Sequence, residues 1–155
     1  LQQIRDYVYA HTKEKNTLPV FRFDHDRQHW TYDHTRDAGW PVTGYLRVTL
    51  AQDAALVSPV AFWEAGKAPY LYMDAAYHTG AAKGCVYWKT SGKDFGGDQR
   101  MAFDIRGDGQ FHRYRIPLKD AAAYRGYITR LKIVPAEGTP GSGDWVEIRS
   151  IALGN

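Results

Sequence analysis

After Pro19 the chain alternates between apolar and polar residues in short runs, and this pattern predicts β-strands. A strand places successive side chains on opposite faces of a sheet, so apolar residues at every second position indicate one face packed on a core. Glycine, proline and Asp-Gly pairs separate most of the runs, as turns do. The runs cover residues 20–23, 44–50, 70–77, 85–89, 101–105, 112–118, 127–134 and 145–153.

Eight or nine short strands without a long helix between them predict an all-β fold, an antiparallel β-sandwich of the jelly-roll type. The sequence "RGDGQ" at 106–110 lies between two runs and predicts a β-hairpin. Leu1, Ile4 and Val8 are spaced for one face of a helix, which predicts a short helix before the strands. We therefore expect two parts, a helical linker or terminal segment over residues 1–19 and a β-sandwich module over residues 20–155.

The run that begins at Tyr70 has one face suited to a core and one suited to a ligand. Leu71 and Met73 predict the buried face. Tyr72 and Asp74 alternate with them and so point outward, on the same side as Tyr70. An outward ring beside a carboxylate is a candidate contact for a ligand.

The run that contains the single cysteine divides in the same way. Trp88 and Val86 share one face, which we interpret as core. Tyr87 and Lys89 then point outward as candidate ligand contacts. Cys85 is expected to be a small buried hydrophobic residue, and one cysteine allows no disulfide within the chain.

Basic residues occupy outward positions in two further runs. Arg113 and Arg115 alternate with apolar residues in one run, and Arg130 and Lys132 do so in the other. Guanidinium groups bind carboxylate or sulfate in a bidentate fork, which favours an acidic ligand. If these strands share one sheet with the outward tyrosines, they form a basic face that carries aromatic rings. An ordinary solvated sheet face is the alternative interpretation.

Composition narrows the function classes. The chain has 155 residues, enough for one domain with a core, and 11 Tyr and 5 Trp. A net charge of +3 is too small to indicate a nucleic-acid-binding protein. No apolar stretch is long enough to span a membrane, and no signal peptide is visible. The chain also lacks GxSxG, P-loop and GxGxxG patterns, which argues against several enzyme classes.

Several motifs follow one another in a recognisable order. They are "FRFDHDRQHW", "GYLRVTL", "CVYWKT", "FGGDQRMAFDIRGDGQFHRYRIPLKD", "YRGYITRLKIVPAEG" and "DWVEIRSIALGN". Over residues 20–153 this succession resembles the galactose-binding-like jelly-roll modules of bacterial polysaccharide-degrading enzymes. The resemblance implies a non-catalytic carbohydrate-binding module. It also implies a secreted or periplasmic location and a glycoside hydrolase or polysaccharide lyase domain in the same chain.

Two positions depart from the pattern of those modules. Tyr124 stands where they usually have tryptophan, and Arg149 stands where many have an aspartate. That aspartate often helps hold a structural calcium ion, which needs oxygen ligands that arginine lacks. Asp24, Asp26 and Glu147 could supply oxygens, although solvated carboxylates are the favoured interpretation. We expect no other cofactor.

Loop residues form a second candidate site. Trp30, Trp40 and Trp63 lie near turns, and Trp40 is the best ligand candidate because the position of Trp30 resembles a structural one. Three nearby histidines have the spacing of a weak zinc motif, but solvated loop residues are the favoured interpretation. These histidines are His25, His29 and His34.

Sugar binding needs flat rings for the C–H face of a pyranose and polar groups for its hydroxyls. We therefore predict that a module without catalysis of its own binds a polysaccharide, and the outward arginines and lysines favour an acidic one. The alternatives are an accessory β-sandwich that binds no sugar, and a polysaccharide lyase that uses Tyr114 with His112. The candidate contacts are Trp40, Tyr72, Asp74, Tyr87, Lys89, Arg113, Arg115, Arg130 and Lys132.

Overall fold

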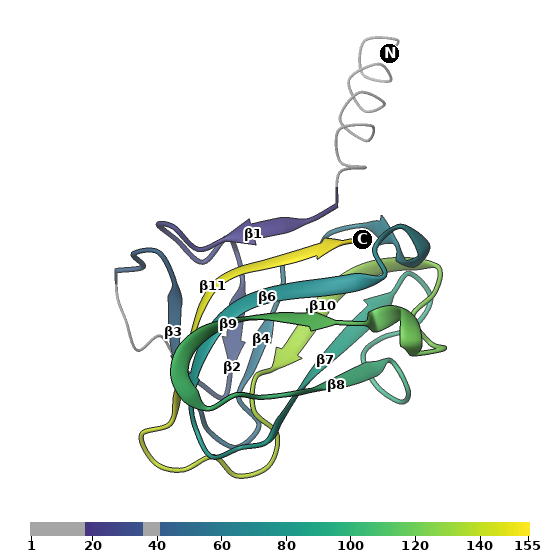
Figure 1. Cartoon of the computed structure of the whole chain (residues 1–155). Coiled ribbons are helices and arrows are strands. Elements are labelled where there is room, and N and C mark those ends of the chain that lie inside the picture. The colour runs from purple at the N-terminus through teal and green to yellow at the C-terminus, as the bar shows by residue number, and fades with distance from the viewer. Residues whose placement is uncertain (1–17, 36–40) are drawn as a thin grey trace.

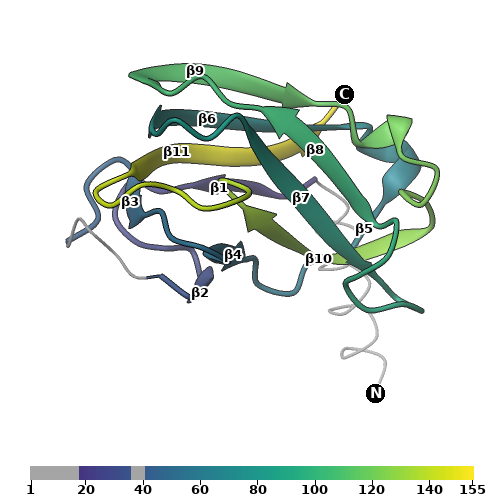
Figure 2. The ribbon, with the colours of Figure 1, turned by 90° about the horizontal axis from the view of Figure 1, so that it is seen from below.

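The computed structural model describes residues 18–35 and 41–155, and these form two facing antiparallel sheets (Figures 1 and 2). The all-β sandwich expected from the alternating pattern is confirmed. Two short 3-10 helices, η1 (Ala65–Lys67) and η2 (Leu118–Asp120), interrupt the strands. No helix of the described ranges is long and apolar enough to cross a membrane. The helix expected before the strands lies outside these ranges.

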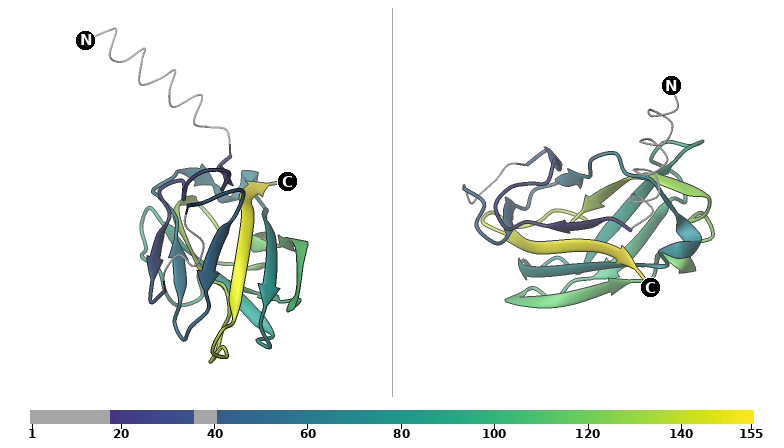
Figure 3. Two further views of the ribbon diagram at one scale, coloured as in Figure 1. Left: turned by 90° about the vertical axis from the view of Figure 1, so that its left-hand side faces the viewer. Right: turned by 90° about the horizontal axis from the view of Figure 1, so that it is seen from above.

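The first sheet, here called sheet A, has five strands. Its main path is β1–β11–β6–β9, and β3 also pairs with β11. Figure 3 shows β11 between β1 and β6, with β9 outermost. The bounds are β1 (Val20–Arg22), β3 (Leu46–Thr49), β6 (Tyr70–His78), β9 (Asp108–Ile116) and β11 (Trp145–Gly154).

The second sheet, here called sheet B, has six strands. Its main path is β2–β4–β10–β7–β8, and β5 pairs with β10. The bounds are β2 (Thr31–Asp33), β4 (Ala55–Val57), β5 (Trp63–Glu64), β7 (Lys83–Thr90), β8 (Arg100–Asp104) and β10 (Tyr127–Val134). Strands β2, β4 and β5 were not expected from the sequence, because two or three residues are too few to show alternation.

The inward positions of both sheets meet in one hydrophobic core. Leu71 and Met73 of β6 are fully buried, as are Trp88 of β7 and Leu131 and Ile133 of β10. The parity derived from the sequence is therefore correct for these strands. It fixes which side chains point away from the core on each sheet.

The turn "RGDGQ" does not form the expected hairpin. Within the described ranges, β8 pairs with β7 in sheet B and β9 pairs with β6 in sheet A. The chain crosses between the sheets after β8, so that Phe103 and Tyr114 meet inside the core with ring centroids 5.9 Å apart. Gly107 allows this crossing, because a Cβ there would lie 1.9 Å from the carbonyl oxygen of Thr79. The hairpin prediction is wrong because a turn with two glycines can also carry the chain from one sheet to the other.

Candidate functional site

The predicted contact residues that the structure describes lie on two opposite surfaces. Strands β6 and β9 belong to sheet A, whereas β7 and β10 belong to sheet B. Tyr72 and Tyr87 therefore point away from the core in opposite directions, and the single basic face considered from the sequence does not exist. The error arises because residues 79–82 connect β6 to β7 across the sandwich, although the sequence there looks like an ordinary turn.

A groove of about 510 Å³ runs over the outer face of sheet B. Tyr87 of β7 lies in it beside Lys132 of β10, its partner in the strand register. On the other side of Tyr87, the register partner is Arg100 of β8. The Lys132 ammonium is 5.6 Å and the Arg100 guanidinium 5.7 Å from the centroid of the Tyr87 ring. A half-buried ring between two hydrogen-bond donors thus lies within the groove.

One side of the groove is held by a network around Arg100. Its Nη2 donates a hydrogen bond of 2.8 Å to Oε1 of Glu137, and its Nε donates one of 3.3 Å to Sγ of Cys85. Cys85 points to this face but is fully buried beneath these groups. Burial raises the pKa of the Cys85 thiol and, likewise, that of the Tyr87 hydroxyl. Tyr87 therefore stays a neutral hydroxyl that can donate and accept hydrogen bonds.

The opposite side of the groove carries free carboxylates. Asp33 ends β2, and Asp53 lies in the turn before β4. Of the described residues, none forms an ion pair or side-chain hydrogen bond with either carboxylate. His34 and Asp53 have backbone φ angles of 56° and 62°, in the left-handed region that His and Asp enter more readily than most other residues.

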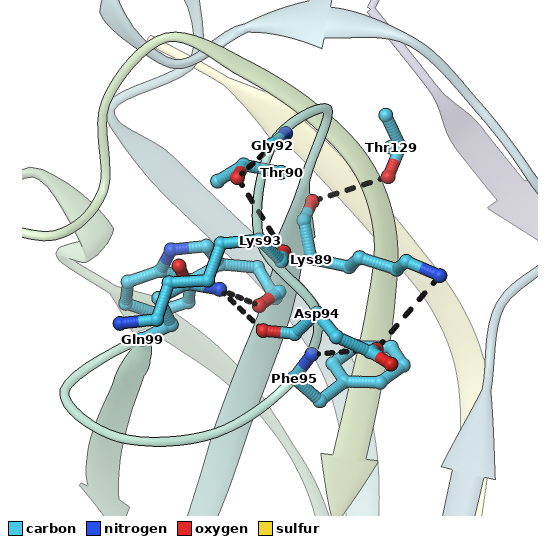
Figure 4. A network of polar contacts seen from close by, with 9 residues as sticks. Lys89, Thr90, Gly92, Lys93, Asp94, Phe95, Gln99 and Thr129 are labelled. Atoms are coloured by element: carbon cyan, nitrogen blue, oxygen red, sulfur yellow. Dashed lines mark hydrogen bonds and ion pairs between the residues drawn. The ribbon is translucent and has the colours of Figure 1, made fainter.

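Lys89 and Arg130 lie on the same sheet face but do not line the groove. Figure 4 shows Lys89 near Asp94 of the β7–β8 hairpin, with Nζ 3.8 Å from Oδ1. The hairpin is fixed by Gln99, whose amide donates to the carbonyl oxygens of Trp88 and Asp94. Arg130 is partly buried and its Nε has no hydrogen-bond partner among the described residues. Two of the four predicted contacts on sheet B, Tyr87 and Lys132, are therefore in the groove.

Most of the residues that line the groove were not predicted from the sequence. Arg100 could have been found by extending the alternation of β8 backward by one residue. Asp33 and Asp53 could not, because they border strands too short to predict. Glu137 lies after β10 and reaches the site through its bond to Arg100.

Four predicted contacts lie on the outer face of sheet A: Tyr72, Asp74, Arg113 and Arg115. Arg113 stacks over Tyr72, with 4.6 Å between the guanidinium carbon and the ring centroid. Asp74 is 3.9 Å from Arg149 of β11. These residues form a second surface, separate from the groove.

The loop tryptophans do not form a site in the described ranges. Trp30 is 1% exposed and packs on Phe21 and Phe23, which confirms its structural role. Trp63, expected near a ligand, is buried, and its Nε1 donates a 3.0 Å hydrogen bond to Tyr124. The prediction for Trp63 is wrong because the residue begins β5 on the sheet rather than lying in a loop. Trp40 lies outside the described residues.

The candidate metal ligands are not assembled. No group of three or more His, Cys, Asp or Glu side chains among the described residues could hold a metal ion. Glu147, considered for calcium, forms an ion pair of 3.4 Å with Arg47. Arg149 lies over the ring of Phe111, 3.5 Å from its centroid.

Tyr114, the base considered for a polysaccharide lyase, is not suited to that role. Tyr114 is 8% exposed and packs edge-on against Tyr77 and Phe103. Burial raises the pKa of Tyr114, and its hydroxyl accepts a hydrogen bond from the backbone N–H of Arg106. A buried phenol with a raised pKa is a poor proton acceptor from a sugar ring.

The fold is similar to those of solved carbohydrate-binding structures. A xylan-binding module, CBM86, of Roseburia intestinalis has a TM-score of 0.57 at 13% identity, covering 88% of this chain and 94% of that one. A cellulose-binding domain of a Cellulomonas fimi β-1,4-glucanase has a TM-score of 0.53 at 14% identity, covering 90% and 94%. The similarity is in the fold. No protein-family model and no curated protein matches the chain.

A glycoside hydrolase family 43 arabinoxylan arabinofuranohydrolase of Bacillus subtilis contains the same kind of sandwich. The TM-score is 0.55 at 12% identity, covering 88% of this chain and 27% of that chain. The fold thus occurs both as a separate module and within an enzyme chain.

Proposed function

We propose that this chain is a non-catalytic carbohydrate-binding module that holds a glycan in the groove of sheet B. The observation that carries the proposal is the Tyr87 ring between Lys132 and Arg100, facing the free carboxylates of Asp33 and Asp53. The ring suits the C–H face of a pyranose, and the charged groups suit its hydroxyls.

The charges of the groove favour a neutral glycan. Asp33, Asp53 and Glu137 are acidic, whereas Lys132 and Arg100 are basic. Arg100 already binds Glu137, so the groups of the groove without an ion pair among the described residues are one ammonium and two carboxylates. The carboxylates would repel a further negative charge from a uronate or sulfate group.

We further propose that the module acts in the same chain as a polysaccharide-degrading enzyme, outside the cytoplasm. Attachment raises the effective concentration of a catalytic domain on its polymer, so that weak contacts with single sugars suffice. The occurrence of the fold within a family 43 glycoside hydrolase supports this arrangement.

A structural accessory role is the second candidate. Phe62 and Tyr127 stack with ring centroids 4.8 Å apart and are 58% and 44% exposed, and Val60, two residues before Phe62, is exposed as well. An exposed apolar patch suits a contact with another domain. This patch is separate from the groove and provides a control for it.

Affinity electrophoresis through gels containing xylan, β-glucan, galactan or mannan tests the groove. We expect retardation by at least one neutral polymer and a loss of affinity of about 10-fold in Tyr87→Ala. Tyr127→Ala, which removes an exposed ring elsewhere, should bind as the parent does. Absence of retardation by every polymer, or unchanged binding by Tyr87→Ala, would favour the accessory role.

A further inference from the structure

Three cations gather at one corner of the outer face of sheet A. Arg113 and Arg115 point outward from β9, and Lys119 lies in η2 just beyond that strand. Arg115 lies 3.9 Å and the Lys119 ammonium 5.3 Å from the centroid of Tyr70, while Arg113 stacks over Tyr72. We call these three residues the cationic corner.

Within the described ranges, Arg113, Arg115 and Lys119 form no ion pair with a carboxylate. Two other arginines on the same face do have partners, since Arg47 pairs with Glu147 and Arg149 lies near Asp74. Asp74 faces Arg113 in the strand register but forms its ion pair with Arg149, so the three cations of the corner have no ion pair of their own within the described ranges.

The rings hold these cations in place. A guanidinium stacked on an aromatic face keeps its N–H groups free at its edge, where they can donate to an anion. The Tyr72 ring is itself fixed, because its hydroxyl donates a hydrogen bond of 2.8 Å to the carbonyl oxygen of Asn155. Less side-chain freedom remains to be lost on binding.

The pKa of the Tyr70 hydroxyl reflects the positive electrostatic potential at the cationic corner. Its pKa is lowered, chiefly because Lys119 interacts with the hydroxyl and secondly because Arg115 does so. Positive groups that stabilise a phenolate stabilise other anions at the same place.

We propose that the cationic corner is a second glycan site, which binds the carboxylate or sulfate groups of an acidic polysaccharide. Arg113 and Arg115 are two residues apart on one strand face, so their Cα atoms are about 7 Å apart. Two bidentate forks at this spacing suit repeated anionic groups along a polymer. The glycan class rests on the proposed carbohydrate binding, but the site is on the opposite sheet from the groove.

The experiment measures affinity for polygalacturonate, which carries carboxylates, and for dextran sulfate. Arg113→Gln/Arg115→Gln should weaken binding to at least one of them by about 10-fold or more, and which arm responds identifies the anion. The matched control is Arg27→Gln/Arg125→Gln, which removes two positive charges away from the cationic corner. It also removes one stack of a guanidinium on a ring, that of Arg27 on Tyr32. Sodium chloride should weaken the parent's binding by screening.

Unchanged affinity of Arg113→Gln/Arg115→Gln for both acidic polymers overturns the inference. If Arg27→Gln/Arg125→Gln weakens binding as much as Arg113→Gln/Arg115→Gln does, the effect is one of general charge and the inference is also overturned. The same holds if the parent binds single-stranded DNA as tightly as it binds the acidic polysaccharides. If the double variant does not fold by circular dichroism, Lys119→Gln decides, with an expected loss of about 3-fold. If the groove proposal alone is wrong, the protein will bind the acidic polysaccharides but none of the neutral ones.

Discussion

Tyr87 and Trp88 are neighbours in the chain with opposite roles. Tyr87 faces the groove, whereas Trp88 is fully buried and lies edge-on to Tyr124 with ring centroids 5.2 Å apart. The Trp88 indole also donates a 3.1 Å hydrogen bond to the carbonyl oxygen of Ala123. The parity of a single strand thus assigns one ring to stability and the next to binding.

Trp88→Ala should lower the free energy of unfolding by about 3–5 kcal/mol, because it leaves a large cavity in the core. Tyr87→Ala removes a half-buried surface ring and should cost about 1 kcal/mol or less. Urea unfolding followed by circular dichroism measures both. Similar losses in the two variants would contradict the orientation of β7.

Alkaline pH should destabilise the protein through its buried tyrosines. Burial raises the pKa of Tyr124 to about 12, and burial also raises the pKa of Tyr77 well above its usual range. Between pH 10 and 12 the unfolded chain loses these protons while the folded protein keeps them. The unfolded state then binds fewer protons, so the free energy of unfolding falls as the pH rises, by about 2 kcal/mol for Tyr124.

Urea unfolding between pH 8 and 12 checks this loss. Tyr124→Phe should show a shallower decline because it has no proton to lose at this position. The variant should be less stable at neutral pH, since it leaves the Trp63 N–H and the carbonyl of Ala68 without their partner. A decline as steep as the parent's would show that Tyr124 does not contribute.

At the scale of strands, alternation predicted direction but not sheet membership. Leu71, Met73, Leu131 and Ile133 are inward as expected, because period-two patterning reflects one buried face. Nothing local distinguishes a turn that joins two paired strands from one that crosses the core. The β7–β8 connection is a hairpin, while those after β6 and β8 change sheet. The eight predicted contacts on strands are therefore divided between two outer surfaces, four on each sheet, rather than gathered on one.

The two crossings offer a paired test of this topology. Gly107→Ala places a Cβ against the backbone oxygen of Thr79, which cannot move as a side chain can, so we expect a loss of about 1–3 kcal/mol. Gly80 lies in the neighbouring crossing with nothing within 4 Å of an added Cβ. Gly80→Ala should change stability by about 0.5 kcal/mol or less. Thermal unfolding of both variants gives the comparison, and equal effects would contradict the crossing at Gly107.

At the scale of the whole molecule, the groove and the cationic corner face away from each other across the sandwich. Packed sheets lie about 10 Å apart, with side chains adding to the distance on both outer faces. One module should therefore link a neutral and an acidic polysaccharide chain. Adding the protein to a mixture of the two polymers should raise the viscosity. Tyr87→Ala or Arg113→Gln/Arg115→Gln should each abolish the rise, and a rise that persists in both variants would contradict two separate sites.

The position of β9 at the margin of sheet A has a further consequence. Within the described ranges its backbone pairs only with β6, so its other side is available to an incoming strand. Like charges at Arg113 and Arg115 discourage two copies from joining margin to margin. A bound polyanion cancels this repulsion, so copies crowded along an acidic fibre are the ones most prone to self-association.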